Sequence, residues 1–304
     1  MKEHNNRKEA KKFTEFITGK ELRQYVAKKV LEYVGENPTV FDGAVGSGQL
    51  EQFVNPTKIY AVEIQEKACN ALKENFENVD VENKSFFNYT REDTLADCVI
   101  MNPPFSLTYK GLTLEEQANI TKAFTWKKSG KLDDIFILKA LKYTTRFAFF
   151  VVPLGITYRN TEEKFRQLIG NTLVELNVVK NAFEDTSIDV GFLVIDKEKT
   201  TSEVKKEIFD CKTNNCEFRE EGDLEEEEKQ YHKWMLPHAP IKEPEIDINK
   251  VNFDLKNNTI EGFRASLKVN KVLQKIGVET YSLDIIQEIR KICDEYELIF
   301  KEVE

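Results

Sequence analysis

Two hydrophobic periods alternate along the first two-thirds of the chain. Leu22, Val26 and Val30 recur at every fourth residue, which predicts a helix over residues 20–33. Short apolar runs that end at glycine, proline or asparagine predict strands instead. After the first helix we expect strands at 39–41, 59–63, 79–81 and 98–101, and helices from residue 49 and over 65–76. This alternation of strand and helix predicts a doubly wound, mostly parallel α/β sheet.

Composition limits the kind of protein that this chain can be. Its 304 residues, 40% hydrophobic and 11% aromatic, can bury a sizeable core as one large domain with an appendage or as two domains. The net charge of −9 is acidic for a protein that holds nucleic acid unaided. Five cysteines without dense spacing are typical of reduced thiols, and no apolar run resembles a signal peptide or reaches membrane-spanning length. We therefore expect a cytoplasmic protein without a membrane partner.

A glycine-rich turn follows the strand at 39–41. Gly43, Gly46 and Gly48 let the backbone turn sharply and come close to a ligand. Asp42 at the start of the turn would repel a pyrophosphate, but it would attract a ligand that carries an ammonium or a sulfonium. Glu63 ends the next strand, where an acid can accept the two hydroxyls of an adenosine ribose. Together these features predict a nucleoside cofactor with a cationic end.

The strand at 98–101 ends abruptly at Asn102-Pro103-Pro104-Phe105. Neither proline can donate to a sheet ladder, so the strand has to stop here. The Asn102 side-chain oxygen and the Pro103 carbonyl could accept the two hydrogens of a planar amine, while Phe105 lies on the face of its ring. A proline-rich turn that simply ends a strand would look the same in isolation. The glycine turn upstream favours the binding site.

These segments resemble the motifs of amino-methyltransferases that modify adenine at N6. Residues 41–48, Glu63 and residues 102–105 are similar to motifs I, II and IV, in the order of the gamma class. The greatest similarity is to the modification (M) subunits of type I restriction systems. Further similarity lies in Phe16-Ile-Thr18 (motif X), 146–155 (fifth strand), 182–186 (motif VIII) and 190–196 (last strand), so that it covers residues 13–197.

The resemblance implies a fold, a reaction and a set of site residues. The fold would be that of class I S-adenosylmethionine-dependent methyltransferases, with a seven-stranded sheet and a smaller, partly helical C-terminal extension. The reaction would transfer a methyl group from S-adenosyl-L-methionine to adenine N6 in DNA, within a restriction-modification system that has a separate specificity subunit. The residues implied to bind the cofactor are Thr18, Asp42, Gly43, Gly46, Gly48, Glu63, Ile64, Ser85, Phe86 and Asn102, and the catalytic residues are Asn102, Pro103, Pro104 and Phe105.

Phe105 and Phe183 are the candidates for stacking on the two faces of the target base. Phe183 fits equally well as a core aromatic beside the last strand. No strong base is required if two acceptors localise the amine lone pair, which agrees with the lack of histidine in the core region.

The sequence departs from the family pattern in three respects. Gly19 follows Thr18 where the family has proline, and Ser85 stands where motif III has an aspartate. Ser85 can bind the cofactor adenine amine, but less strongly than a carboxylate would. The N-terminal helical domain and a target-recognition domain are missing, so we expect a compact catalytic core. The expected division is a lead-in with motif X at 1–38, the core at 39–197 and an extension at 198–304.

Three alternatives share these residues. The target could be adenine in structured RNA, or a glutamine amide on a protein. Glutamine methyltransferases favour tyrosine in the fourth place of the motif, so Phe105 favours a base. The chain could also be a catalytically idle DNA-binding or antirestriction module, but intact Asp42, Glu63 and Asn102 argue against decay.

The C-terminal third has weaker signals. We expect a charged linker at 198–206, an acidic run at 220–229, and helices at 267–276 and 283–300. In the last helix Ile285, Ile289, Ile292 and Tyr296 form an apolar stripe that packs on the core or on a partner, and we predict that it docks the specificity subunit.

Four residues of this third match the spacing of a Cys₂His₂ zinc site. They are Cys211, Cys216, His232 and His238. The residues between them are mostly glutamates and do not predict a helix packed on a hairpin. We therefore favour two incidental pairs and predict no metal.

Overall fold

The computed structural model describes residues 1–2, 18–105, 107–184, 186, 188–224, 232–239, 248–278, 290–291 and 294. The chain divides into two compact units, Met1–Pro240 and Ile241–Glu304, and each is described by itself. Phe16 of the predicted motif X and all four residues of the predicted apolar stripe lie outside the described residues. Of the predicted helix at 283–300, the structure describes residues 290, 291 and 294.

The first unit is built on one twisted sheet whose strand order is β3-β2-β1-β4-β5-β7-β6-β8-β9. The first four strands pair in parallel with one another and with β5, while β7 runs antiparallel to both of its neighbours. This confirms the predicted doubly wound, mostly parallel sheet, with two strands more than the seven expected. The strands are β1 (Thr39–Asp42), β2 (Lys58–Glu63), β3 (Val79–Asn83), β4 (Ala96–Met101), β5 (Thr144–Pro153), β6 (Leu173–Lys180), β7 (Val190–Asp196), β8 (Glu203–Asp210) and β9 (Asn215–Asp223).

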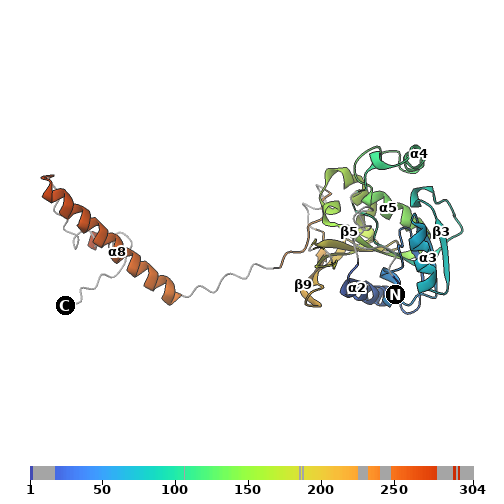
Figure 1. The fold of residues 1–304 in the computed structure, drawn as a ribbon, viewed down its shortest axis with the longest axis horizontal. Coiled ribbons are helices and arrows are strands. Elements are labelled where there is room, and N and C mark those ends of the chain that lie inside the picture. Colours follow the sequence, from blue (N-terminus) through green and yellow to red (C-terminus); the bar gives the residue numbers. More distant parts are fainter. Residues whose placement is uncertain are drawn as a thin grey trace. The chain divides into compact units, whose positions relative to one another are not determined.

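Helices cover both faces of the sheet (Figure 1). Alternate residues of β4 serve the two layers, because Cys98 and Ile100 pack with α2 while Val99 and Met101 pack with α5 and α6. The helix predicted over 20–33 is confirmed residue for residue as α2. The α-helices are α2 (Lys20–Tyr33), α3 (Glu66–Asn75), α4 (Leu114–Ala123), α5 (Asp133–Ala140), α6 (Glu163–Ile169) and α8 (Ile248–Lys275). The 3₁₀ turns are η1 (Leu50–Phe53), η2 (Phe86–Asn88), η3 (Tyr109–Gly111), η4 (Leu141–Tyr143), η5 (Leu154–Thr157), η6 (Asn160–Glu162) and η7 (Gly170–Thr172).

The additional strands β8 and β9 correct the predicted charged linker at 198–206. β8 begins at Glu203 and pairs with β6, and β9 forms the edge of the sheet. The sequence did not predict β8 because two charged residues, Lys206 and Glu207, are buried on it. The division predicted at residue 197 stays a prediction, although the sheet itself continues beyond it.

A buried ion cluster fastens α2 to β6 and β8. The Lys29 ammonium lies 2.6 Å from Glu175 Oε2 and 3.1 Å from Glu207 Oε2, and all three side chains are at most 6% exposed. The Tyr33 hydroxyl donates to Glu175 Oε1 at 2.5 Å, and Tyr25 donates to Glu207. Removing one member of such a cluster leaves uncompensated buried charge.

The second unit contains α8, which begins earlier than predicted. The helix runs from Ile248 instead of residue 267. Apolar residues at Val251, Leu255, Val269 and Val272 follow helical spacing over this longer range, although asparagines and Gly262 interrupt the pattern in the sequence.

We expect Lys29→Ala to lower the free energy of unfolding by about 3–5 kcal/mol, because it leaves the buried Glu175 carboxylate without its cation and removes one of the two cations that pair with Glu207. Lys28→Ala, on the exposed face of the same helix, is the matched control and should change stability little. Urea unfolding followed by circular dichroism measures both. Equal stability of the two variants would show that the cluster contributes nothing.

Candidate functional site

The predicted site residues meet at one edge of the sheet. Asp42 and Glu63 are the last residues of β1 and β2, Asn102 directly follows β4, and Ser85 lies two residues after β3. These four strands are parallel neighbours in the order β3-β2-β1-β4, so their carboxyl ends share one edge. The order reverses between β1 and β4, and at such a switch point open α/β sheets bind ligands.

The glycine turn is tied to the end of β2. The Gly46 amide donates to Glu63 Oε2 at 2.9 Å, and the Gln65 amide donates to Glu63 Oε1 at 2.8 Å. Asp42 Oδ1 accepts a hydrogen bond of 2.7 Å from the Ala44 amide. Gly48 has φ of +82°, a conformation that a residue with a Cβ adopts only with strain. The turn therefore places both carboxylates at one site.

The same turn packs directly on the loops that leave β3 and β4. A Cβ on Gly43 would lie 2.7 Å from Met101 Cε and 2.8 Å from the Phe86 ring. Phe86 is 4% exposed and packs among core rings, including that of Phe136 at 5.8 Å. Its side chain is therefore part of the core, and its predicted role at the cofactor stays a prediction.

The loop after β4 presents Asn102 to the site. Asn102 is half-buried, and its side chain forms no hydrogen bond with any described residue, so both its oxygen and its amino group are available to a ligand. Pro103 is buried and Pro104 half-buried. Phe105 is buried in the same cluster as α2.

Three distant predicted residues come together around Phe105. The rings of Phe105 and Phe183 lie 5.9 Å apart at 68°, edge to face. Phe183 forms a β-bridge with Thr18, whose amide donates to Gln49 Oε1 at 3.1 Å. The structure thus joins the segments similar to motifs X, IV and VIII. A base could stack on both rings only if one of them moved.

At the opposite end of the site, Ile64 and Ser85 flank Glu63. Ile64 is 66% exposed, which is open apolar surface beside the ribose position predicted for Glu63. The Ser85 hydroxyl donates to Glu116 Oε1, and Glu116 Oε2 accepts from the Thr113 amide at 2.8 Å. The sequence analysis missed Glu116. The sequence pattern Thr113-x-x-Glu116, which is typical of a capping box, could have pointed to this residue. The structure forms that capping box at the start of α4.

A second missed carboxyl lies behind the glycine turn. Glu51, in η1, is fully buried, and its oxygens accept no well-formed hydrogen bond from another described N–H or hydroxyl group, so its polar neighbour is the carboxyl of Asp42. Burial raises its pKa to about 7. Burial and then the charge of Glu51 raise the pKa of Asp42 well above its usual range. The sequence around Glu51 contains no pattern that predicts its burial beside Asp42.

The structure does not bring the four residues with zinc spacing together in one group of side chains. Cys211 and Cys216 belong to the β8–β9 hairpin and are free thiols. Among the residues that the structure describes, which include all four, no group of three or more His, Cys, Asp or Glu side chains could hold a metal ion. In the same described part, no helix has the length and apolarity needed to cross a membrane.

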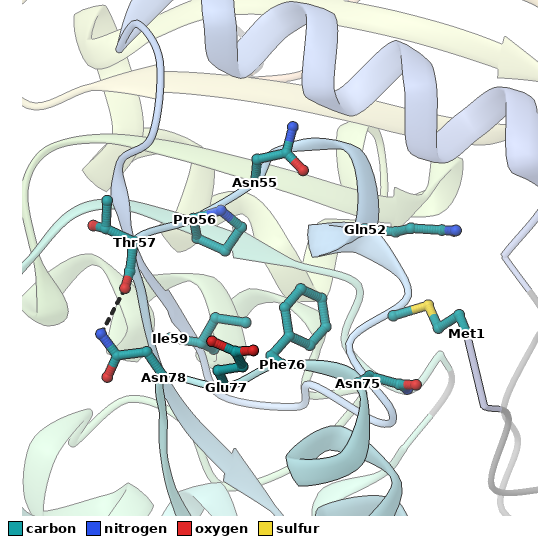
Figure 2. Close-up of a pocket in the computed structure, with 10 residues that line it drawn as sticks. All are labelled: Met1, Gln52, Asn55, Pro56, Thr57, Ile59, Asn75, Phe76, Glu77 and Asn78. Carbon is teal, nitrogen blue, oxygen red and sulfur yellow. Dashed lines mark hydrogen bonds between the residues drawn. The ribbon is translucent and has the colours of Figure 1, made fainter.

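A cavity of about 560 Å³ lies away from the predicted residues (Figure 2). Its walls include Thr57 and Asn78, which precede β2 and β3, so it opens at the amino ends of the strands. The side-chain Nδ2 of Asn78 donates to the Thr57 carbonyl at 2.6 Å. None of the predicted site residues lines it.

The sequence model of one family, described as N-6 DNA methylase, matches residues 1–253. The chain belongs to the N-6 DNA methylase family. The match includes every residue that the sequence analysis assigned to the site.

Several solved structures share the fold of this chain. The type I restriction-modification methyltransferase subunit from Streptococcus thermophilus is 20% identical, with a TM-score of 0.54 over 66% of this chain and 49% of that chain. A chain from a structure of a type I R-M system is 13% identical, with a TM-score of 0.60 over 90% of this chain and 68% of that chain. The type IIG restriction endonuclease BpuSI is 16% identical, with a TM-score of 0.55 over 72% of this chain and 32% of that chain. The fold is therefore the predicted class I methyltransferase fold, and the chain spans about half the length of the Streptococcus subunit.

We expect Gly48→Ala to destabilise the protein by roughly 1–3 kcal/mol, because φ is +82° and the new Cβ would lie 2.5 Å from the Phe76 ring. Gly111→Ala is the control, since its Cβ would meet Thr108 Oγ1 at an ordinary 3.5 Å. Thermal unfolding of both variants measures the difference. A Gly48→Ala variant as stable as the wild type would show that the turn tolerates a side chain.

Proposed function

We propose that this chain transfers the methyl group of S-adenosyl-L-methionine to the N6 amine of adenine in DNA. The observation that carries the proposal is the position of Asn102, with its unused hydrogen-bonding groups, directly after β4 and beside the Asp42 turn. The membership of the N-6 DNA methylase family supports the same reaction.

The residues at the edge of the sheet fit the cofactor. Asp42 would face its cationic methionine end, and Glu63 would accept its ribose hydroxyls. A carboxylate has about four acceptor sites, so Glu63 can do this in addition to its bonds from Gly46 and Gln65. Ser85, with Glu116 behind it, would bind the adenine amine, and the exposed Ile64 would cover the adenine ring.

The chemistry assigned to the chain is mainly positioning. When bound, the cofactor supplies a methyl group already activated by a sulfonium. Asn102 Oδ1 and the Pro103 carbonyl accept the two hydrogens of the adenine amine and so localise its lone pair towards the methyl group. Holding the two reacting atoms in line can account for much of the rate. The amine gains the methyl group and releases one proton.

DNA requires that the target base leave the helix stack, at a cost of a few kcal/mol. Phe105 would offset part of this cost by stacking on the base. Because Phe183 contacts Phe105 edge to face at 5.9 Å, the base would displace one of these rings when it enters. The ring displacement would make entry selective for a base that stacks well.

A lysine-rich segment favours a nucleic acid over a protein substrate. Residues 107–131 contain five lysines and two glutamates, a balance of +3 in a chain whose net charge is −9. Lys110, Lys122 and Lys128 in this segment are exposed. They follow the Phe105 loop in the chain, and lysines bind phosphates.

We propose that site selection depends on a separate specificity subunit. Within the second unit, α8 and the first residue after it expose apolar side chains at heptad spacing, with Leu255 59%, Val269 58% and Ile276 68% exposed. Such a stripe is normally buried against another helix. It therefore joins the predicted stripe at 285–296 as a candidate docking surface, and the chain alone would bind DNA weakly.

Methyl transfer from labelled cofactor to DNA, RNA and protein separates the candidate substrates. We expect label in DNA, recovered as N6-methyladenine, and its loss in Asn102→Ala with cofactor affinity largely kept, because Asn102 acts on the amine in the transition state. Label recovered in RNA, or in glutamine of the protein, would show that this molecule is the substrate instead of DNA. Full activity of Asn102→Ala would contradict the mechanism.

We expect the double variant Lys110→Ala, Lys128→Ala to weaken DNA binding equally for all sequences. The slope of log K against log salt should fall by about two, close to one for each phosphate contact. Fluorescence anisotropy with short duplexes at several salt concentrations measures this, with Lys28→Ala as the control. An unchanged slope would place the DNA elsewhere.

A further inference from the structure

Glu51 is a buried acid that the proposed chemistry does not use. It lies in η1, which packs against α2 and β4, and its side chain is 0% exposed. Its carboxyl oxygens accept no well-formed hydrogen bond from another described N–H or hydroxyl group, and the side chain with which the carboxyl can share a proton is Asp42. A carboxylate buried in this way is costly unless it binds a proton or faces a cation.

The groups around Glu51 do not provide that cation. Asp42, at the end of β1, is its electrostatic neighbour. The pKa of Cys98 on β4 is raised by burial, by Asp97 and then by the charge of Glu51. From α2, the Arg23 guanidinium donates to the Thr18 carbonyl at 2.7 Å and to Gln52 Oε1 at 2.9 Å. On the far side of Asp42, Glu63 adds a further negative charge.

Two carboxyl groups in this surrounding cannot both ionise readily near neutral pH. Burial raises the pKa of Glu51 to about 7, and the pKa of Asp42 is raised well above its usual range by burial and by Glu51. Such a pair titrates as a unit. The pair therefore holds protons more strongly than two ordinary carboxyl groups, and Asp42 has less charge to offer a ligand than an ordinary aspartate.

We propose that Glu51 sets the charge of Asp42, so that the two carboxyls hold protons in the free chain and release one when the cationic methionine end of the cofactor binds. This inference rests on the proposed function, because S-adenosyl-L-methionine is its ligand. The exchange balances, since the ligand adds one positive charge beside Asp42 and one proton leaves to solvent. Glu51 is a positioning residue, because it is buried behind Asp42 and acts through it.

The direction of the pH effect follows from the raised pKa values. Binding needs the ionised form, so the affinity should rise with pH through about 7. The release of one proton gives up to about a tenfold gain per pH unit below the pKa of the pair. Above that pKa the affinity should level off.

Calorimetry with S-adenosylhomocysteine, which keeps the ammonium end, tests the inference. We expect affinity to increase from pH 6 to pH 8, and buffers of different ionisation enthalpy to show proton release near neutral pH. Glu51→Gln removes one carboxyl and lowers the pKa of Asp42. This variant should bind more tightly than the wild type at pH 6, and its affinity should rise at a lower pH than that of the wild type, because burial still raises the pKa of Asp42. The probe 5′-methylthioadenosine, which lacks the amino-acid end, should bind with the same affinity at each pH.

Three results would overturn the inference. They are binding of S-adenosylhomocysteine without proton release, the same pH profile in Glu51→Gln and the wild type, and weaker binding of Glu51→Gln at every pH, as a merely structural role would give. The wild-type proton count needs no variant, so it stands even if Glu51→Gln fails to fold. Failure of both probes to bind the wild type would overturn the proposed function as well, whereas binding without proton release would leave it standing.

Discussion

The turn that leaves β1 packs so closely on the end of β4 that even a methyl group between them would collide. The missing Cβ of Gly43 marks this contact, with Met101 on one side and Phe86 on the other. Because the turn, the Asn102 loop and η2 are fixed against each other here, the groups assigned to the cofactor and to the target amine occupy one place. A reaction that depends on aligning two bound groups needs this kind of fixed spacing.

Charge in this chain is managed locally. A net charge of −9 conceals a buried lysine paired with two glutamates, a lysine-rich segment after the Phe105 loop and two adjacent carboxyls behind the glycine turn. Each arrangement has a separate role: the first fastens α2 to β6 and β8, the second is proposed to bind phosphates, and the third is proposed to adjust its charge to a cation. Net charge therefore says little about any single face of the molecule.

The sequence predicted most of the sheet that positions the site, because β1 to β4 are apolar runs bounded by glycine, proline or charge. The predicted strand at 59–63 became β2 at Lys58–Glu63, and the helix at 65–76 became α3 at Glu66–Asn75. β8 was missed because Lys206 and Glu207 are buried on it, and the charge of Glu207 is compensated by Lys29, which is distant in the sequence. Glu51 was missed for the same reason, since burial of an acid is decided by the fold. The roles of the predicted site residues stay predictions.

A crystal structure with S-adenosylhomocysteine tests the central claim, that the switch point between β1 and β4 is the cofactor site. The account predicts the ribose hydroxyls on Glu63, the adenine beside Ser85 and Ile64, and the amino-acid end against Asp42. Ligand density in the cavity at the amino ends of β2 and β3 (Figure 2), with none at the switch point, would contradict it.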